Sequence, residues 1–384
     1  MDRSGTRVIV FAPNWLGDAV MAVPCLELLK RRDPAATLAV AARAHLAPLY
    51  EMVDAVDEVV ALQPVSGFGG ARAALADAGR LRAGRFDVAV LLPNSFRSAL
   101  IARLAGIRER RGYARDGRRW LLTHAAAPPE RVHMVEYYRR LVNGVGLDFA
   151  DHENVSQKGD RRNQARPHLS VRADARERAR ALLAAHGWTP GATLVGMAPG
   201  AAYGTAKQWL PERFAQLAAE LGAEGVRTVL VGTNADVEVC ARIAQGGGPL
   251  NLAGRTTLAE LAAVVAECGS FVTNDSGAMH IAVAVGAPVT ALIGPTQEWE
   301  TGPDYPRLEV RESESPNVRK SESPNVRESD GSPPSSPHAM IIGEVPCRPC
   351  MLRECPTQHE CMVAITVDRV KAAVFAQLAA GKRA

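Results

Sequence analysis

Ser270-Phe271-Val272-Thr273-Asn274-Asp275-Ser276-Gly277-Ala278-Met279-His280 is the stretch that decides the fold. It begins with a short apolar run typical of a buried strand, then continues into helix-capping residue types and a glycine that lets a ligand approach the backbone. Gly286 predicts the end of the helix, Pro288 prevents its continuation, and 289–293 predicts a second buried strand. A helix that begins at the carboxyl end of a parallel strand is where open α/β sheets bind phosphate. The turn alone is equally consistent with an ordinary strand–helix–strand crossover.

The length and composition of the chain suit helices packed on parallel strands. Its 384 residues exceed the usual size of one domain, so we expect two. Hydrophobic residues make up 47% of the chain and aromatic residues only 5%, which favours an α/β fold. The formal net charge of +4 is too small to indicate a nucleic-acid partner. No signal peptide is visible, and the longest apolar run is interrupted by Gly286 and Pro288, so we expect a cytoplasmic protein.

The first predicted unit is a strand over 7–12 followed by a helix over 18–32. The turn between them, Pro13-Asn14-Trp15-Leu16-Gly17-Asp18, lacks the glycine triplet of a dinucleotide-binding fingerprint. It places the carboxylate of Asp18 in the first turn of a helix, at the top of a sheet. Asp18 is either a helix cap or a general base that faces a cleft between domains. Spacing alone favours the cap.

The remainder of the first half alternates predicted strands and helices, with strands at 37–41, 58–61 and 87–92. The loop Pro93–Ser98 follows the last of these strands and opens a stretch rich in arginine. A charge run is usually a solvated face, but arginine beside a cleft also suits an anionic acceptor or an anionic membrane surface. The arginines of this stretch are Arg97, Arg103, Arg108, Arg110, Arg111, Arg115, Arg118 and Arg119.

The second half repeats the alternation after a polar stretch, 151–167, that predicts a linker. A helix is predicted over 173–186, and strands over 193–197 and 228–231. Between those strands, a glycine-bearing loop carries Lys207 and leads to a proline that opens the next helix. Lys207 either brings a point charge to a phosphate or is an ordinary solvated lysine.

Several motifs together resemble the ADP-heptose:lipopolysaccharide heptosyltransferases, glycosyltransferase family 9. Three of them occur in the order and spacing of the family: Asn14–Asp18 with Pro24, then 198–211, then 273–280 with Gly294-Pro295-Thr296. The segment from Cys347 to Cys361 and the loop Pro93–Ser98 resemble the heptosyltransferase II branch in particular.

The resemblance implies an α/β chain with two Rossmann-like domains facing across a cleft, the B-type glycosyltransferase architecture. An acceptor-binding domain would cover 1–170, a nucleotide-sugar-binding domain 171–308 and 339–365, and a helix and tail 366–384. The implied reaction moves L-glycero-D-manno-heptose, with inversion, from ADP-heptose to the first heptose of the lipopolysaccharide inner core. The acceptor would be of the heptosyl-Kdo2-lipid A type, and the enzyme would be peripheral on the inner face of the inner membrane. The alternatives are transfer to another core position and a non-catalytic regulatory protein that binds the nucleotide sugar.

The same resemblance assigns roles to individual residues. Asp18 becomes the expected general base, on the face of the sugar opposite the leaving group. A helix N-terminus supplies only about half an elementary charge, so Lys207 is expected to help neutralise the diphosphate. The expected donor-site residues are Lys207, Thr273, Asn274, Asp275, Ser276, Gly277 and His280. The expected acceptor-side residues are Asn14, Asn94, Ser95 and Arg97.

Two patterns bear on metals. No Asp-x-Asp pair occurs in the chain, so we expect no metal and no other cofactor to be required for catalysis. A cysteine cluster near the C-terminus predicts either a structural metal, such as zinc, or reduced thiols packed in a loop. The cluster consists of Cys347, Cys350, Cys355 and Cys361.

An unusual insertion precedes the cysteine segment. Ser313–Arg319 is repeated as Ser321–Arg327, and Ser-, Pro- and Gly-rich sequence follows. Such composition cannot bury enough apolar area to fold, so a disordered loop is predicted over 309–338. A closing helix is predicted over 366–379, which we expect to cross back toward the first domain.

Overall fold

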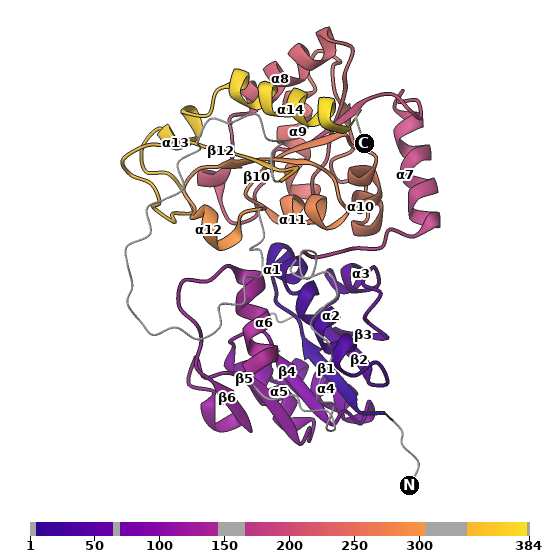
Figure 1. Ribbon diagram of the computed structural model, residues 1–384, viewed down its shortest axis with the longest axis vertical. Helices are drawn as coiled ribbons and strands as arrows, with labels where there is room; N and C mark the ends of the chain where they lie inside the picture. The colour runs from indigo at the N-terminus through magenta and orange to yellow at the C-terminus, as the bar shows by residue number, and fades with distance from the viewer. Residues whose placement is uncertain (1–4, 64–69, 145–165, 304–335, 382–384) are drawn as a thin grey trace.

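The computed structural model describes residues 5–63, 70–144, 166–303 and 336–381. It contains two parallel six-stranded sheets, one above the other, each with helices on both faces (Figure 1). The predicted α/β class with two Rossmann-like sheets is therefore confirmed. We call the part built on the first sheet the N-terminal domain and the part built on the second the C-terminal domain.

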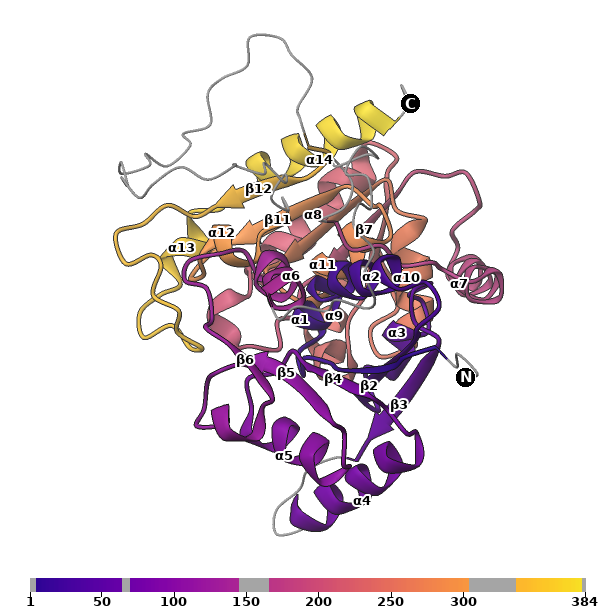
Figure 2. The same ribbon diagram turned by 60° about the horizontal axis from the view of Figure 1, so that its bottom comes forward.

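The N-terminal domain has the strand order β3-β2-β1-β4-β5-β6. Its central strands are buried on both faces because they are runs of valine, isoleucine, leucine and alanine. The strands are β1 Arg7–Phe11, β2 Thr37–Arg43, β3 Glu58–Leu62, β4 Val88–Leu91, β5 Glu109–Tyr113 and β6 His124–Ala126. The helices are α1 Leu16–Met21, α2 Val23–Arg32, α3 Ala47–Tyr50, α4 Gly70–Ala83, α5 Phe96–Leu104 and α6 Met134–Gly144, with the 3₁₀ turn η2 Arg119–Leu121. Figure 2 shows α4 and α5 on the outer face and α1, α2 and α6 on the face toward the C-terminal domain.

The C-terminal domain has the strand order β12-β11-β10-β7-β8-β9. Its strands are β7 Leu194–Ala198, β8 Arg227–Leu230, β9 Leu250–Asn251, β10 Ser270–Asn274, β11 Val289–Ile293 and β12 Ala339–Ile342. The helices α7 Ala173–Ala185, α10 Leu258–Ala266 and α11 Gly277–Ala284 cover one face of the sheet, while α8 Pro211–Ala223, α9 Val237–Ile243 and α14 Val367–Gly381 cover the other. The short elements are η3 Thr205–Lys207, η4 Asn234–Asp236, α12 Glu298–Thr301 and α13 Glu360–Val363.

Both sheets reverse their strand order at an equivalent place, between β1 and β4 in the first and between β7 and β10 in the second. In open α/β sheets, ligands bind outside the carboxyl ends of the strands at this reversal. The loops after β1 and β4, and those after β7 and β10, are therefore where the topology places a site.

Two predicted helices differ from the structure. The helix predicted over 18–32 is two helices, with a break at Ala22. Pro24 lies in the first turn of α2 and has no backbone N–H to donate to the preceding turn, so the helix restarts there. The closing helix is present as α14, but it packs against α8 and the second sheet instead of crossing back toward the N-terminal domain. Its Gln377 amide donates to the Val289 carbonyl at 2.8 Å, and its amide oxygen accepts from the Ser270 hydroxyl at 2.6 Å.

Two other predictions lie mostly outside the described residues. They are the repeat-bearing loop predicted over 309–338 and the linker predicted over 151–167, of which only 336–338 and 166–167 are described. The exact domain boundaries therefore stay a prediction. Within the described ranges, no helix is long and apolar enough to cross a bilayer.

Candidate functional site

The two domains touch where α1 meets α11. Each helix contributes a glycine to the contact. A Cβ added to Gly17 would lie 2.9 Å from Cδ2 of His280, and one added to Gly277 would lie 2.8 Å from Cβ of Leu16. No side chain fits at either position without movement of its neighbour. The predicted phosphate turn of the C-terminal domain thus lies directly against the turn that carries Asp18.

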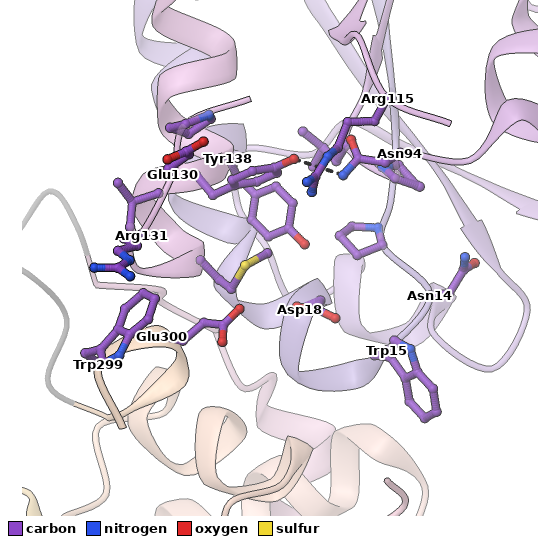
Figure 3. Close-up of a pocket in the computed structure, with 17 residues that line it drawn as sticks. Asn14, Trp15, Asp18, Asn94, Arg115, Glu130, Arg131, Tyr138, Trp299 and Glu300 are labelled. Atoms are coloured by element: carbon purple, nitrogen blue, oxygen red, sulfur yellow. Dashed lines mark hydrogen bonds between the residues drawn. The ribbon is translucent and has the colours of Figure 1, made fainter. Parts of the chain in front are cut away.

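A cavity of about 570 Å³ opens beside this contact and has walls from both domains (Figure 3). Asp18 lies on the cavity wall formed by the N-terminal domain, and Glu300 projects into the cavity from α12 of the C-terminal domain. The other polar and aromatic residues that line it include Asn14, Trp15, Asn94, Arg115, Glu130, Arg131, Tyr137, Tyr138 and Trp299.

Asp18 does not cap the helix that holds it. The N-cap position of α1 is occupied by Trp15, and no side chain caps that helix. Instead, Asp18 shares the cavity wall with Tyr138, whose hydroxyl acts to lower the pKa of the Asp18 carboxyl group. Burial, followed by the negative charge of Glu300, raises the pKa of Asp18 to about 6. A carboxyl group whose pKa lies this close to neutrality, on a cavity wall, has the properties of a general base.

Lys207 is not a solvated loop lysine. Its side chain is only 13% exposed, and its Nζ donates to the Asp275 carboxylate at 2.7 Å. The ammonium also lies 4.9 Å from the centre of the Tyr203 ring. Burial alone would raise the pKa of Asp275, but Lys207 and a hydrogen bond from Thr296 outweigh burial and hold that pKa below its ordinary value. The N-terminus of α11 therefore carries a buried ion pair beside it.

Two residues of the predicted phosphate turn hold the turn together. The Asn274 side chain accepts from the Trp209 backbone N–H at 3.0 Å and donates to the Pro199 carbonyl at 2.7 Å, which joins the loop after β7 to β10. The buried Thr273 hydroxyl donates to the Asn274 carbonyl at 2.9 Å. Ser276 is the N-cap residue of α11 and makes no side-chain capping bond. The backbone at Ser276 and Gly277 is therefore the part of this turn best placed to meet an anion.

His280 lies one turn into α11 and is buried at the contact between the domains. Burial lowers its pKa to about 4, against the opposing effect of Asp275, and His133 and Lys207 contribute to the lowering. The imidazole is neutral at physiological pH. Its position beside Gly17 places it at the junction of the predicted phosphate turn with the Asp18 turn.

The four expected acceptor-side residues separate into two pairs. Asn14 and Asn94 line the cavity, and the Asn94 amide donates to the Tyr137 hydroxyl at 2.9 Å. Ser95 and Arg97 have structural partners instead. Ser95 is the N-cap of α5 and accepts from the Ser98 N–H, whereas Arg97 donates to the Gly70 carbonyl and to the Asp77 carboxylate.

Several residues that line the cavity were not among the expected site residues, although two of them belong to segments that the sequence had marked. They are Trp15, Arg115, Tyr138, Trp299 and Glu300. Trp299 and Glu300 follow β11 closely, so the end of that strand was a usable signal. Arg115 was hidden among the other arginines, and Tyr138 comes from α6, which no motif marked.

The cysteine segment supports the site through contacts other than its thiols. All four cysteines are free, and among the described residues no group of three or more His, Cys, Asp or Glu side chains could hold a metal ion, so the structural-metal alternative is unsupported. Arg348 instead donates to the Gly294 carbonyl at 2.6 Å, to the Thr296 carbonyl at 2.8 Å and to the Glu298 carboxylate at 2.6 Å. Through these hydrogen bonds, the cysteine segment stabilises the loop that carries Glu300.

Comparison with known proteins gives a consistent result. The family model of glycosyltransferase family 9 (heptosyltransferase) matches residues 75–329. Lipopolysaccharide heptosyltransferase 2 of Salmonella typhimurium is 34% identical over 310 residues, which cover 77% of this chain and 85% of that protein. Lipooligosaccharide heptosyltransferase 2 of Haemophilus influenzae is 32% identical over 311 residues, covering 77% and 86%. The solved structure of E. coli ADP-heptose lipopolysaccharide heptosyltransferase II superposes with a TM-score of 0.75 at 26% identity, covering 98% of this chain and 100% of that one.

Proposed function

The chain belongs to glycosyltransferase family 9, the heptosyltransferases, and from this membership we propose that it transfers L-glycero-D-manno-heptose from ADP-heptose to the first heptose of the lipopolysaccharide inner core. The observation that carries the proposal is the position of Asp18. A carboxylate with a raised pKa shares one cavity with residues of the C-terminal domain, while the Lys207–Asp275 pair and the α11 N-terminus lie next to the turn that carries it.

The proposed chemistry is a single inverting displacement. Asp18 takes the proton of an acceptor hydroxyl, and that oxygen bonds to the anomeric carbon as the bond from this carbon to the β-phosphate oxygen breaks. ADP leaves with the electron pair of that bond. Lys207 and the backbone N–H groups at Ser276 and Gly277 stabilise the negative charge that develops on the diphosphate. Tyr138, beside Asp18 on the cavity wall, favours the ionised form of this carboxylate.

The proposal extends to partners and location. The donor is ADP-heptose, the acceptor is of the heptosyl-Kdo2-lipid A type, and no cofactor is required for catalysis. Because that acceptor is anchored in a bilayer, the enzyme works as a peripheral protein at the inner face of the inner membrane. A carboxylate with a raised pKa in the cavity argues against a non-catalytic binding protein, which would not need one.

The deciding experiment measures ADP release with ADP-heptose and three acceptors: Kdo2-lipid A, its monoheptosyl form and its diheptosyl form. We expect release and a mass gain of one heptose only with the monoheptosyl acceptor. Transfer to a different member of the series would assign another core position. ADP-heptose binding without release on any acceptor would favour the regulatory alternative.

The Asp18→Asn variant tests the mechanism in the same assay. Loss of the base should lower kcat by about 10²–10⁴-fold while ADP affinity stays unchanged. Asp116→Asn is the matched control, because Asp116 is exposed and does not line the cavity. Undiminished turnover in Asp18→Asn would remove Asp18 from its proposed role.

A further inference from the structure

The arginine-rich stretch divides into separate groups in the structure. Three of its members have partners within the N-terminal domain. Arg97 forms an ion pair with Asp77, and Arg111 forms one with Glu109. Arg110 donates a hydrogen bond to the Leu121 carbonyl. Arg118 is fully buried. The exposed members are Arg103, Arg108, Arg115 and Arg119. Arg115 lines the catalytic cavity, and Arg119 lines a second hollow of about 460 Å³, so the charge is not one uniform solvated face.

Two large aromatic side chains lie exposed beside this second hollow. Trp120 is 69% exposed and Phe96 is 40% exposed, and their ring centres are 5.9 Å apart. Trp120 lines the hollow together with Arg119, Leu122, Thr123 and Ala125. We call Phe96, Arg119 and Trp120 the aromatic patch. A tryptophan next to arginine on an open surface is the combination that favours the interface of an anionic bilayer, where the ring lies at headgroup depth and the cation meets phosphate.

The two segments that carry the aromatic patch also contribute residues to the wall of the catalytic cavity. Phe96 follows Asn94 closely along the chain, Trp120 follows Arg115, and both Asn94 and Arg115 line the cavity. The buried Arg118 joins these two segments. Its guanidinium donates to the Tyr113 carbonyl at 3.1 Å, to the Asn94 side-chain oxygen at 3.4 Å and also to the Pro93 carbonyl. Patch and cavity wall are therefore parts of one rigid unit.

We propose that the aromatic patch docks on the surface of an anionic phospholipid bilayer and so turns the acceptor side of the cavity toward the membrane. This inference rests on the proposed function, because docking is needed only if the acceptor is anchored in the bilayer and must reach the cavity from its surface. The patch supplies both requirements of such a contact, apolar rings that leave water and a cation that meets lipid phosphate.

The test compares vesicle binding with turnover, using the full chain. Binding is measured by co-sedimentation with vesicles of phosphatidylethanolamine and phosphatidylglycerol, and with vesicles of phosphatidylcholine alone. The unsubstituted protein should bind the anionic vesicles more tightly. Phe96→Ser with Trp120→Ser should weaken that binding by about tenfold or more, since both rings lose their apolar burial. Arg119→Ala should weaken it by about fivefold, the contribution expected of one arginine near an anionic surface.

Turnover on a water-soluble, deacylated acceptor separates the two proposals. We expect it to be unchanged in the double variant, with the melting temperature preserved. Phe96→Tyr with Trp120→Phe should keep vesicle binding, and Val237→Ser, at a comparably exposed apolar position on the C-terminal domain, should not affect it. Vesicle binding that is equal in the double variant and the unsubstituted protein would overturn the docking surface. A joint loss of vesicle binding and soluble turnover would also overturn it, since the rings would then belong to the acceptor site. Absence of turnover in the unsubstituted protein would instead count against the proposed function.

Discussion

At the residue scale, the carboxylate of Asp18 experiences opposing influences from both domains. Burial and Glu300 raise its pKa, with a further contribution from Asp275, whereas Tyr138 and Lys207 lower it. A general base must be ionised to act, so activity should fall as the pH drops through about 6. Glu300→Gln removes a neighbouring negative charge, lowers the pKa of Asp18 and should move this acid limb of kcat/KM to lower pH.

Glu130→Gln is the matched control for the pH profile. Glu130 lines the same cavity but is not among the groups that shift the pKa of Asp18. Profiles of kcat/KM on the soluble acceptor should therefore show a displaced acid limb in Glu300→Gln alone. An unmoved limb in Glu300→Gln would show that the two carboxylates do not interact in the working enzyme.

Lys207 offers a second prediction at this scale. Replacing it with glutamine removes the cation proposed to meet the diphosphate, and a hydrogen bond to a charged group is worth about 1.5–3 kcal/mol. ADP affinity, measured by calorimetry, should therefore fall about 10- to 100-fold. The melting temperature should fall as well, because Asp275 is left buried without its partner. Lys371→Gln, which breaks the pair with Glu220, whose side chains are about twice as exposed as that of Lys207, is the control.

A double variant distinguishes a ligand role of Lys207 from a purely structural one. In Lys207→Gln with Asp275→Asn, no unpaired buried charge remains, so the melting temperature should recover. ADP affinity should stay low if Lys207 meets the diphosphate. Recovery of both quantities would confine Lys207 to supporting Asp275.

Single residues also show where sequence reasoning stops. The family resemblance assigned roles to Asp18 and Lys207, whereas spacing alone favoured a helix cap for Asp18 and allowed an ordinary solvated lysine at position 207. The same resemblance also suggested Asn274 and Arg97 as ligand-binding residues. In the structure, the Asn274 side chain is hydrogen-bonded to the backbone of Pro199 and Trp209. Arg97 forms an ion pair with Asp77. These partners are remote in the chain, and nothing in the local sequence reveals them. Whether an amide or a guanidinium faces a ligand or the fold depends on contacts that only the tertiary structure supplies.

At the element scale, the strands predicted most accurately were those with a continuous apolar sequence. The strand predicted over 289–293 matches β11 without change, whereas β5, Glu-Arg-Arg-Gly-Tyr, was missed among the arginines. Its arginines are accommodated because Arg110 donates to the Leu121 carbonyl and Arg111 pairs with Glu109. A strand that carries long charged side chains with nearby partners lacks the apolar pattern by which strands are predicted from sequence.

Helix α12 gives the prediction at this scale. A helix of four residues cannot hold its own conformation, so the position of Glu300 depends on neighbours. Arg348 is the main such neighbour, because its guanidinium donates hydrogen bonds to the Gly294 and Thr296 carbonyls and to the Glu298 carboxylate. Arg348→Ala should therefore raise the acceptor KM and move the acid limb of kcat/KM to lower pH, as Glu300→Gln does, without changing ADP affinity.

Arg369→Ala is the matched control for this prediction. Arg369 also donates to a backbone carbonyl, that of Ile342, but it is exposed and does not contact the Glu300 loop. Steady-state kinetics over a pH series measures both variants. An acid limb in Arg348→Ala identical to that of the unsubstituted protein would show that α12 keeps its position without this arginine.

At the scale of the whole molecule, the meeting of the two sheets could be anticipated only through resemblance. Alternating strands and helices predict two Rossmann-like units, but no periodicity tells which loops face each other. The pairing depends on Gly17 and Gly277, whose missing side chains let α1 and α11 approach. This contact depends on the absence of a Cβ atom at two positions, which neither the composition of the chain nor its hydrophobic pattern reveals.

The contact predicts a selective effect of adding one methyl group. In Gly277→Ala the new Cβ would lie 2.8 Å from Cβ of Leu16, so α1 and α11 must move apart, although the backbone N–H proposed to meet phosphate is kept. ADP affinity should change little, while kcat should fall on the order of a hundredfold, because the base and the donor no longer align. Gly222→Ala is the control, since a Cβ there meets no atom within 4 Å and the change should stabilise α8 by about 1 kcal/mol. Leu16→Gly in the Gly277→Ala background removes the opposing Cβ together with the rest of the side chain and should restore part of kcat. If Gly277→Ala instead retains full turnover, the close approach of the two helices is not required for transfer, and Asp18 would have to reach the donor in some other arrangement of the domains.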